Sequence, residues 1–399
     1  MKPFENVRVL DLTHVLAGPF CSHQLAMLGA DVIKVEPPSH PDMTRSEGVD
    51  PVQSAELYGS YFLAQSAGKR AMTLDLKSEG GQAIMHRLLQ SADVLLQNYA
   101  GTALGDLGFG PEAAHAINPR LIYCMLSGFG HSGPKADHPA YDNVIQAYSG
   151  LMAANGDPET GPLRVGPPMV DYGTGAQAAM AISAALFQRT QTNKGQVIDV
   201  SMLDSALMLM SAMVVDSTIT GTSPKRHGSD HPYYAGYRTY ETSDGTIMLG
   251  AYTNEQLAKL FDALGETTRA AEVRATPRAD IAASAKADAA MVANNLLSRP
   301  ATEWEDVLNN AHVPAAKIRH LTETLAEEQV KLRGGLQSPG WPDKDTAPAQ
   351  LPVAGFEFAH GGPSIDRVPP QFGEHTNEVL SEIGYSPTEI TELQKQGVV

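Results

Sequence analysis

Short apolar runs alternate with longer amphipathic segments through the first half of the chain. The apolar runs are rich in valine, isoleucine and leucine, and we expect them to form strands at 7–12, 31–36, 71–76, 93–96, 120–126 and 196–201. Helices are expected between them, at 21–28, 78–89, 112–117, 175–189 and 202–215. Strands separated by helices of this length are typical of βαβ units, so the pattern predicts an α/β fold with a mainly parallel sheet.

A second, smaller module follows a loop at 220–237 that is rich in glycine, serine, histidine, proline and tyrosine. We interpret this loop as a domain boundary. The tripeptide Ser243-Asp244-Gly245 separates two strand-like runs and predicts a β-hairpin over 239–250. The remaining expected features are helices at 255–264, 280–297 and 302–310, a proline-rich linker at 339–352 and a last helix at 376–384.

The charge balance excludes some classes of partner. Acidic residues outnumber basic ones by 45 to 29, which gives a formal charge of −16 and disfavours binding to nucleic acid or to anionic lipid. Two cysteines, Cys21 and Cys124, are too few for a disulfide framework, so we expect reduced, buried thiols. The first residues carry charges where a signal peptide needs an apolar stretch, and no apolar run reaches the roughly 18 residues of a membrane span. These features predict a cytoplasmic protein without a membrane partner.

Two motifs resemble ligand sites, but the sequence around each favours a structural interpretation. The segment GFGHSG at 128–133 matches a dinucleotide-binding pattern, but prolines and polar residues follow where a helix would have to begin, so we expect a turn. His227, Asp230 and His231 lie in the glycine-rich loop without helical spacing, so we expect no metal site. The methionines of the segment 202–213 are expected to fill the core or a dimer interface.

Asp171 is the strongest candidate for a chemical role. It stands before Gly173, Gly175 and an alanine-rich helix, where free backbone amides and the helix dipole favour an anion. The glycines leave room for a bulky acyl group and let a developing oxyanion reach backbone N–H groups. The alternative is purely structural, because aspartate is among the best N-cap residues.

Eight segments, taken together and in this order, resemble the class III CoA-transferases, the relatives of formyl-CoA transferase, carnitine CoA-transferase and the α-methylacyl-CoA racemases. The resemblance extends from Thr13 to Tyr385 and is thinnest between about 205 and 370. The segments that carry it are THVLAGPFCSHQLAMLGADVIKVEPP, GKRAMTLDLKS, ADVLLQNYAG, NPRLIYCMLSGFG, PAYDNVIQAYSGLM, VDYGTGAQAAMAISAALFQR, NKGQVIDVSMLD and FGEHTNEVLSEIGY.

The resemblance implies a Rossmann-like large domain, a smaller α+β domain and an interlocked homodimer. The large, CoA-binding domain would comprise 1–205 and be completed by 340–399. The small domain would comprise 232–320, with linkers at 206–231 and 321–339. The active site would lie at the junction of domains and subunits.

The resemblance also implies a mechanism. In the transferases, the aspartate aligned with Asp171 attacks an acyl-CoA thioester and passes through a mixed anhydride and an aspartyl-CoA thioester before a carboxylate acceptor takes over the CoA. Tyr141 and backbone amides near Gly173 would support the oxyanion. CoA enters as a substrate, and no permanently bound cofactor or metal is expected.

Two alternatives to a transferase stay open. The racemase branch needs a histidine and a glutamate for α-proton transfer, but this chain has Tyr141 and Thr253 at those positions, which favours the transferase. A catalytically silent CoA-binding protein is the second alternative, since Pro37 and Asp106 stand where the family often has basic residues.

The binding residues follow from the same alignment. The residues that would contact CoA are His14, Val15, Leu16, Ala17, Arg45, Lys69, Arg70, Asn98 and Tyr99. For the three cations, the alternative is that they are ordinary surface charges. Leu16 replaces a glutamine of formyl-CoA transferase, which argues against formyl or oxalyl specificity. Gly173, Tyr234 and Arg238 would line the acyl pocket, where Arg238 could hold the free carboxylate of a short diacid such as succinate.

Overall fold

The computed structural model describes residues 1–340 and 349–399. The chain divides into two compact units. Unit 1 comprises Met1–Leu151, Arg164–Thr222 and Gln329–Val399, and unit 2 comprises Met152–Leu163 and Ser223–Glu328. Most of the expected linker at 339–352 lies outside the described residues.

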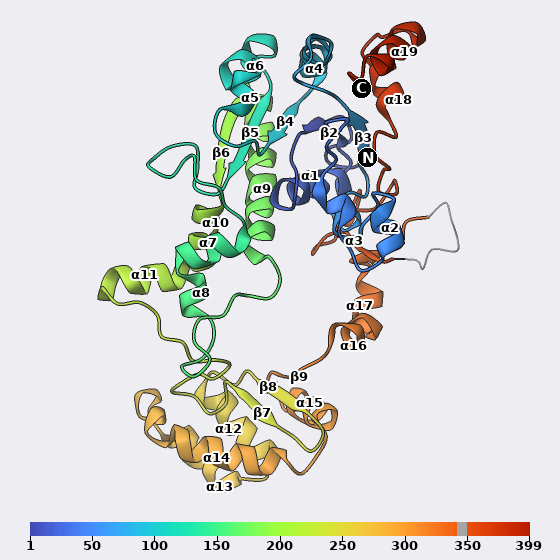
Figure 1. Cartoon of the computed structure of the whole chain (residues 1–399). Coiled ribbons are helices and arrows are strands. Elements are labelled where there is room, and N and C mark those ends of the chain that lie inside the picture. Colours follow the sequence, from blue (N-terminus) through green and yellow to red (C-terminus); the bar gives the residue numbers. More distant parts are fainter. Residues whose placement is uncertain (341–348) are drawn as a thin grey trace. The chain divides into compact units, whose positions relative to one another are not determined.

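A six-stranded parallel sheet forms the centre of unit 1 (Figure 1), in the order β3-β2-β1-β4-β5-β6. Its strands are β1 (Arg8–Asp11), β2 (Asp31–Glu36), β3 (Arg70–Thr73), β4 (Val94–Gln97), β5 (Ile122–Ser127) and β6 (Gln196–Ser201). The α/β fold and the six expected strands are confirmed. This strand order is that of a doubly wound sheet, in which the chain reverses direction across the sheet between β1 and β4 and a crevice opens outside the carboxyl ends of those strands.

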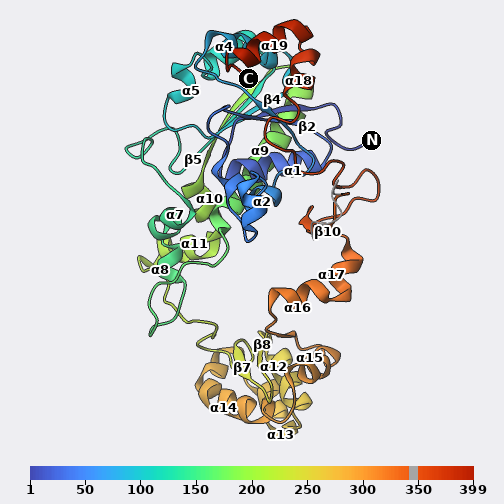
Figure 2. The same cartoon turned by 45° about the vertical axis from the view of Figure 1, so that its right-hand side comes forward.

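Helices cover both faces of this sheet because its strand side chains alternate between two cores. Val9 contributes to the core beneath α1 (Ala17–Met27) and α9 (Met169–Thr192), whereas Leu10 contributes to the core on the other face. The helices of that other face are α4 (Glu79–Ser91), α6 (Pro111–Ile117), α18 (Thr376–Glu382) and α19 (Pro387–Lys395). Figure 2 shows the C-terminal pair α18 and α19 beside α4, so the end of the chain completes this layer.

Helices α1 and α9 pack in close contact. A Cβ added to Gly175 would lie 2.5 Å from the carbonyl oxygen of Ala17, so only glycine allows this approach. The rings of Phe20 and Tyr172 meet edge to face with centroids 4.9 Å apart. The expected start of the helix at 175 is wrong, because α9 begins at Met169. The two early glycines lower helix propensity, but the packing against α1 stabilises the helix there.

The methionine-rich segment forms two helices rather than the single one expected. The helices α10 (Met202–Leu209) and α11 (Ser211–Thr220) meet at an angle of 82°. Met210 at the bend is buried, whereas α11 contains no buried residue, so core contacts end at the bend. Within the described residues, no single helix has the length and apolarity of a membrane span, although this bent pair passes that test jointly.

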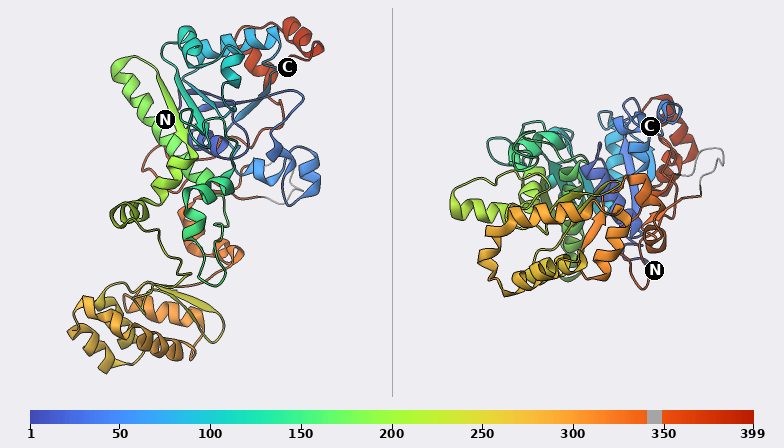
Figure 3. Two further views of the ribbon diagram at one scale, coloured as in Figure 1. Left: turned by 60° about the vertical axis from the view of Figure 1, so that its left-hand side comes forward. Right: turned by 90° about the horizontal axis from the view of Figure 1, so that it is seen from below.

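Unit 2 combines a small antiparallel sheet with several helices. Its strands are β7 (Thr239–Glu241), β8 (Thr246–Leu249) and β9 (Ala315–Lys317), and the expected hairpin is confirmed as β7–β8. Its helices are α12 (Asn254–Ala263), α13 (Thr267–Ala275), the 3-10 helix η2 (Arg278–Ser284), α14 (Ala285–Leu296), α15 (Ala301–Asn310) and α16 (Leu321–Ala326). All of these helices except α16 share one apolar core with the sheet, and Figure 3 shows the yellow and orange helices gathered beside its strands.

The remaining elements are short. They are η1 (Met43–Ser46), α2 (Pro51–Ala55), α3 (Ser60–Leu63), α5 (Ala103–Asp106), α7 (Asp142–Ser149), α8 (Leu151–Ala154), α17 (Glu328–Arg333), and the paired strands β10 (Leu336–Gln337) and β11 (Leu351–Pro352). Helix α19 was not predicted from the sequence. Ser386 and Glu389, which form a capping box at its start, are the signal that could have indicated it.

Candidate active site

A cavity of about 410 Å³ opens in unit 1 at the carboxyl ends of β1, β4 and β5. This is the position at which doubly wound sheets bind their ligands. Its walls come from the loops after these strands, from the segment before α7, and from the starts of α9 and α10. Eight of the residues selected from the sequence line it together: His14, Val15, Leu16, Ala17, Asn98, Tyr99, Tyr141 and Asp171.

Asp171 lies in the first turn of α9, with Pro168 in the N-cap position. The structural alternative, in which Asp171 caps the helix, is therefore wrong. Among the described residues, no donor is hydrogen-bonded to its carboxylate, which faces the cavity. The nearby N-terminus of the helix favours negative charge at this place.

Asp142, a residue that the sequence analysis left without a role, caps α9 from the start of α7. It is 6% exposed, and its Oδ2 accepts hydrogen bonds from the backbone N–H groups of Val170 and Asp171 at 2.8 and 3.0 Å. Its Oδ1 accepts from Nε2 of Gln146 at 2.5 Å, and Oε1 of Gln146 in turn accepts from the backbone N–H of Val165 at 2.9 Å. Asp142 thus fixes the backbone that carries Asp171. Its proximity depends on the packing of α7 against α9, which no local sequence signal reveals.

The environment makes the Asp171 carboxyl unusually basic. Burial raises its pKa most, the nearby charge of Asp142 raises it further, and together they bring the pKa to about 7. A basic carboxylate is a stronger nucleophile than an ordinary one, and at this pKa a large fraction is still ionised near neutral pH. The arrangement suits a carboxylate that attacks an electrophilic carbon.

The loop after β1 forms a second wall of the cavity. The Asn98 carboxamide holds the backbone of His14 in both directions: its Oδ1 accepts from the His14 N–H at 3.1 Å and its Nδ2 donates to the His14 carbonyl at 2.9 Å. Burial lowers the pKa of the His14 imidazole, so the neutral ring is favoured at neutral pH. Tyr141, which precedes α7 and has an exposed side chain, lines the same cavity.

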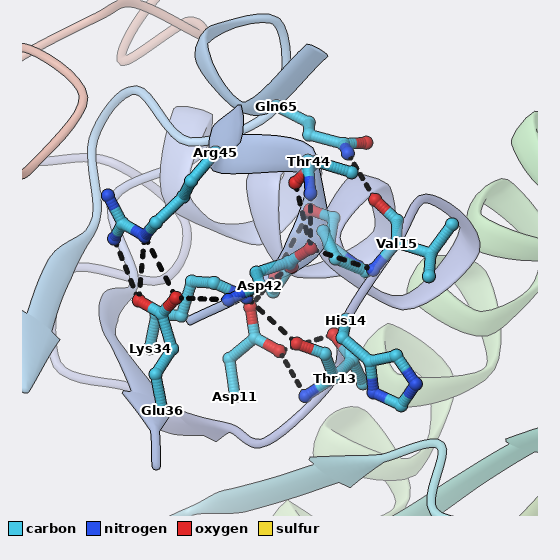
Figure 4. A network of polar contacts seen from close by, with 12 residues as sticks. Asp11, Thr13, His14, Val15, Lys34, Glu36, Asp42, Thr44, Arg45 and Gln65 are labelled. Carbon is cyan, nitrogen blue, oxygen red and sulfur yellow. Dashed lines mark hydrogen bonds and ion pairs between the residues drawn. The ribbon is translucent and has the colours of Figure 1, made fainter. Parts of the chain in front are cut away.

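A buried polar network lies beneath this loop (Figure 4). Lys34 is paired with Asp42 at 2.9 Å and also donates to the carbonyl of Thr13 at 2.8 Å. Burial tends to raise the pKa of Asp11, but Lys69, Lys34 and two hydroxyl donors outweigh it, and the pKa falls to about 2. These charges are therefore maintained inside the protein because each has a partner.

The three cations selected from the sequence do not line the cavity. Arg45 and Lys69 are 0% exposed and are paired with Glu36 at 2.7 Å and with Asp11 at 3.1 Å. The alternative interpretation as surface charges is therefore wrong for both. Arg70 is buried as well and binds three carboxylates, those of Asp31, Glu378 and Glu382. All three guanidinium or ammonium groups are thus engaged by carboxylates of the chain itself.

The candidate residues of the acyl pocket belong to different units of the chain. Gly173 lies inside α9, where an added Cβ would come within 2.9 Å of Leu209. Tyr234 and Arg238 belong to unit 2, and the Arg238 guanidinium is ion-paired with Asp230. The expected turn at 128–133 is confirmed, since the next helix begins only at Asp142.

These features define the class: an α/β protein with a carboxylate of raised pKa in the switch-point crevice of a doubly wound sheet. Residues 4–376 match the model of CoA-transferase family III, and the chain belongs to this family. Enzymes of this family transfer CoA, so their substrates are CoA thioesters.

Relatives with assigned activities cover nearly the whole chain. An acetyl-CoA:oxalate CoA-transferase from Acetobacter aceti is 37% identical over 91% of this chain and 93% of its own length. A succinate–glutarate CoA-transferase from Agrobacterium fabrum is 34% identical over 96% of each chain. The crystal structure of a CAIB/BAIF family protein from Brucella suis is 32% identical, covers 96% of this chain and 99% of its own, and superimposes with a TM-score of 0.83.

Proposed function

We propose that this enzyme is an acyl-CoA:carboxylate CoA-transferase that uses Asp171 as its nucleophile. The observation that carries the proposal is the Asp171 carboxylate itself, which lines the cavity, has no hydrogen-bond donor among the described residues and has a pKa of about 7. A carboxylate held in this way can attack a thioester, whereas one bound in an ion pair would be a poor nucleophile.

The reaction consists of four displacements. Asp171 attacks the thioester carbonyl, the C–S bond breaks, and CoA leaves as a thiolate, which gives a mixed anhydride. The thiolate then attacks the Asp171 carbonyl carbon, releases the donor carboxylate and leaves an aspartyl-CoA thioester. The acceptor carboxylate attacks this thioester, and the released thiolate takes the acyl group from the new anhydride. Asp171 is regenerated, and no net proton is consumed.

Each step develops an oxyanion that needs donors in a site with little water. We assign the Tyr141 hydroxyl to this task. The backbone amides at the start of α9, which were expected to share it, are already engaged: those of Val170 and Asp171 donate to Asp142, and that of Tyr172 donates to the Pro168 carbonyl. Support for Tyr141 comes from its place in the lining of the cavity.

We assign the acyl-CoA arm to the wall formed by His14–Ala17, Asn98 and Tyr99. The cavity presents backbone and a carboxamide here, which suits the amide groups of pantetheine. We leave Arg45, Lys69 and Arg70 out of this site, since each is engaged by carboxylates of the chain.

Short dicarboxylates are the proposed acyl groups. The Acetobacter relative acts on oxalate and the Agrobacterium relative on succinate and glutarate, and all three are short diacids. An acceptor panel of oxalate, succinate and glutarate against acetate and butyrate tests the proposal. Equal turnover of the monoacids would contradict it.

We also propose that the enzyme is a homodimer, interlocked as in the family resemblance. Large apolar side chains stand on the surface of unit 1, among them Phe187 at 68% and Ile219 at 77% exposure, and a second copy would cover them. Light scattering of the purified enzyme tests this, because a mass of one chain would contradict it.

The nucleophile is tested with Asp171→Ala. We expect this variant to bind CoA in a calorimetric titration and to transfer none. Retained transfer would refute the assignment. Two outcomes with the wild type would favour the alternatives. Exchange of the α-proton in deuterated water without CoA transfer would indicate a racemase or isomerase. CoA binding without either reaction would indicate a silent CoA-binding protein.

A further inference from the structure

Val15 has a backbone conformation that β-branched residues avoid. Its φ angle is +70°, in the left-handed region, where Cβ branching causes steric conflict. Such strain persists only where the surroundings impose it, and it is concentrated at functional sites. Val15 lies in the wall of the cavity that contains Asp171, two residues before the first residue of α1.

Two side chains form hydrogen bonds to the backbone of Val15, one to its N–H and the other to its carbonyl (Figure 4). The N–H of Val15 donates to Oδ1 of Asp42 at 3.3 Å, and the carbonyl of Val15 accepts from Nε2 of Gln65 at 2.6 Å. Asp42 is itself fixed by Lys34 at 2.9 Å and by the N–H and hydroxyl of Thr44. The side chains come from segments 27 and 50 residues away in the sequence.

The burial of Gln65 that allows this contact leaves one of its own polar atoms without a hydrogen bond. It is 1% exposed, and its Oε1 is buried without a hydrogen-bond partner in the described part of the chain. A buried orphan acceptor is unfavourable, and so is the left-handed conformation that it helps to hold. Two unfavourable features that meet at one peptide group indicate that the conformation serves a purpose other than stability.

The consequence of this conformation is the direction of the next two peptide groups. The N–H groups of Leu16 and Ala17 have no acceptor among the described residues, and both residues line the cavity. If Val15 returned to a negative φ, the chain would rotate at this point and these N–H groups would turn away from their present direction. The conformation of Val15 therefore determines which donors the wall offers.

We propose that Gln65 and Asp42 are positioning residues, which hold Val15 in its strained conformation so that the N–H groups of Leu16 and Ala17 meet the thioester carbonyl oxygen of the acyl-CoA substrate. The inference rests on the proposed function, since it concerns the same cavity. It assigns the two residues no contact with the substrate, and they act through the backbone.

The test separates this role from simple packing. Gln65→Met keeps the shape of the side chain and removes the donor, and we expect kcat/KM for the acyl-CoA to fall about 10-fold. Val15→Gly is then added, because glycine adopts a φ of +70° without strain and needs no clamp. We expect the double variant to recover most of the lost kcat/KM, whereas a loss of packing at residue 65 would not be rescued in this way. Ser66→Ala is the matched control: Ser66 is the next buried residue, its hydroxyl has no partner in the described structure, and we expect wild-type kinetics.

Melting temperatures of all variants verify that each is folded. Wild-type kinetics of Gln65→Met, or a double variant no better than Gln65→Met alone, would overturn the inference. Its failure can be distinguished from a failure of the proposed function. If Asp171→Ala still transfers CoA, the proposed function fails; if Asp171→Ala is inactive while Gln65→Met has wild-type kinetics, only this inference fails. If Gln65→Met proves unfolded, Asp42→Asn with and without Val15→Gly provides the same comparison.

Discussion

The role of Asp142 gives the sharpest quantitative prediction. Its charge and the burial of Asp171 together raise the Asp171 pKa from 3.8 to about 7. This shift of about 3 units corresponds to a preference for the neutral carboxyl of roughly 4 kcal/mol. Burial is the larger cause and the charge of Asp142 the smaller, so Asp142 accounts for less than half of the rise in pKa.

Asp142→Asn removes the charge and retains an acceptor for the backbone of α9. We expect the pH midpoint of kcat/KM to fall below 7, by at most about 1.5 pH units, which is half of the whole rise in pKa. Above pH 8 the variant is slower by a few-fold, because a less basic carboxylate is a weaker nucleophile. Below pH 6 the difference narrows, because a larger fraction of the variant is ionised.

The assay is a pH–rate profile between pH 5 and 9 with urea unfolding measured in parallel. One of the two oxygens that accept hydrogen bonds becomes an NH₂ group, so we expect a loss of stability of about 1 kcal/mol. Asp204→Asn, which removes an exposed acid from the first turn of α10, is the matched control and leaves the midpoint unchanged. An unchanged or raised midpoint in Asp142→Asn would refute the reasoning.

Three further predictions concern stability. Asp171→Asn stabilises the protein at pH 8 by about 2 kcal/mol, after allowance for partial exposure, because at this pH the folded protein must hold an ionised carboxylate in an environment that favours the neutral form. The gain in stability shrinks as the pH falls from 7 towards 4, where the folded carboxyl takes up its proton. Urea titrations that show no such trend would contradict the raised pKa. Lys69→Met leaves Asp11 without its buried partner and lowers the free energy of unfolding by about 3 kcal/mol, while a loss of no more than 0.5 kcal/mol would mean that the pair is dispensable. Gly175→Ala forces α1 and α9 apart and lowers the free energy of unfolding by about 2 kcal/mol, as measured by thermal unfolding. The control is Ala178→Gly in the same helix, which creates a small cavity and no clash.

The fold could be predicted from the sequence because it depends on local patterns. Two of the strands, β2 and β6, begin and end at the expected residues. The start of α9 could not be predicted, since the close contact of Gly175 with Ala17 outweighs the low helix propensity of glycine. The bend at Met210 likewise reflects where burial ends rather than any helix-breaking residue.

The site was predicted in part, for the same physical reason. Asp171 and the loop at 14–17 follow from sequence motifs and meet in one cavity. Asp142 and Gln65 act on backbone groups 28 to 50 residues away, and such contacts leave no trace in a local pattern. Lys69 was predicted to contact CoA only from the family resemblance, and no local pattern reveals that its carboxylate partner Asp11 allows it to be buried.

The covalent intermediate on Asp171 is the central claim, and peptide mass mapping tests it most directly. The enzyme is incubated with succinyl-CoA, acetyl-CoA and oxalyl-CoA in turn, treated with hydroxylamine, digested and analysed by mass spectrometry. The account predicts a hydroxamate, or without hydroxylamine a CoA thioester, on the peptide containing Asp171, and its absence in Asp171→Asn. An enzyme that transfers CoA while this peptide stays unmodified, or that carries the adduct on another residue, would contradict it.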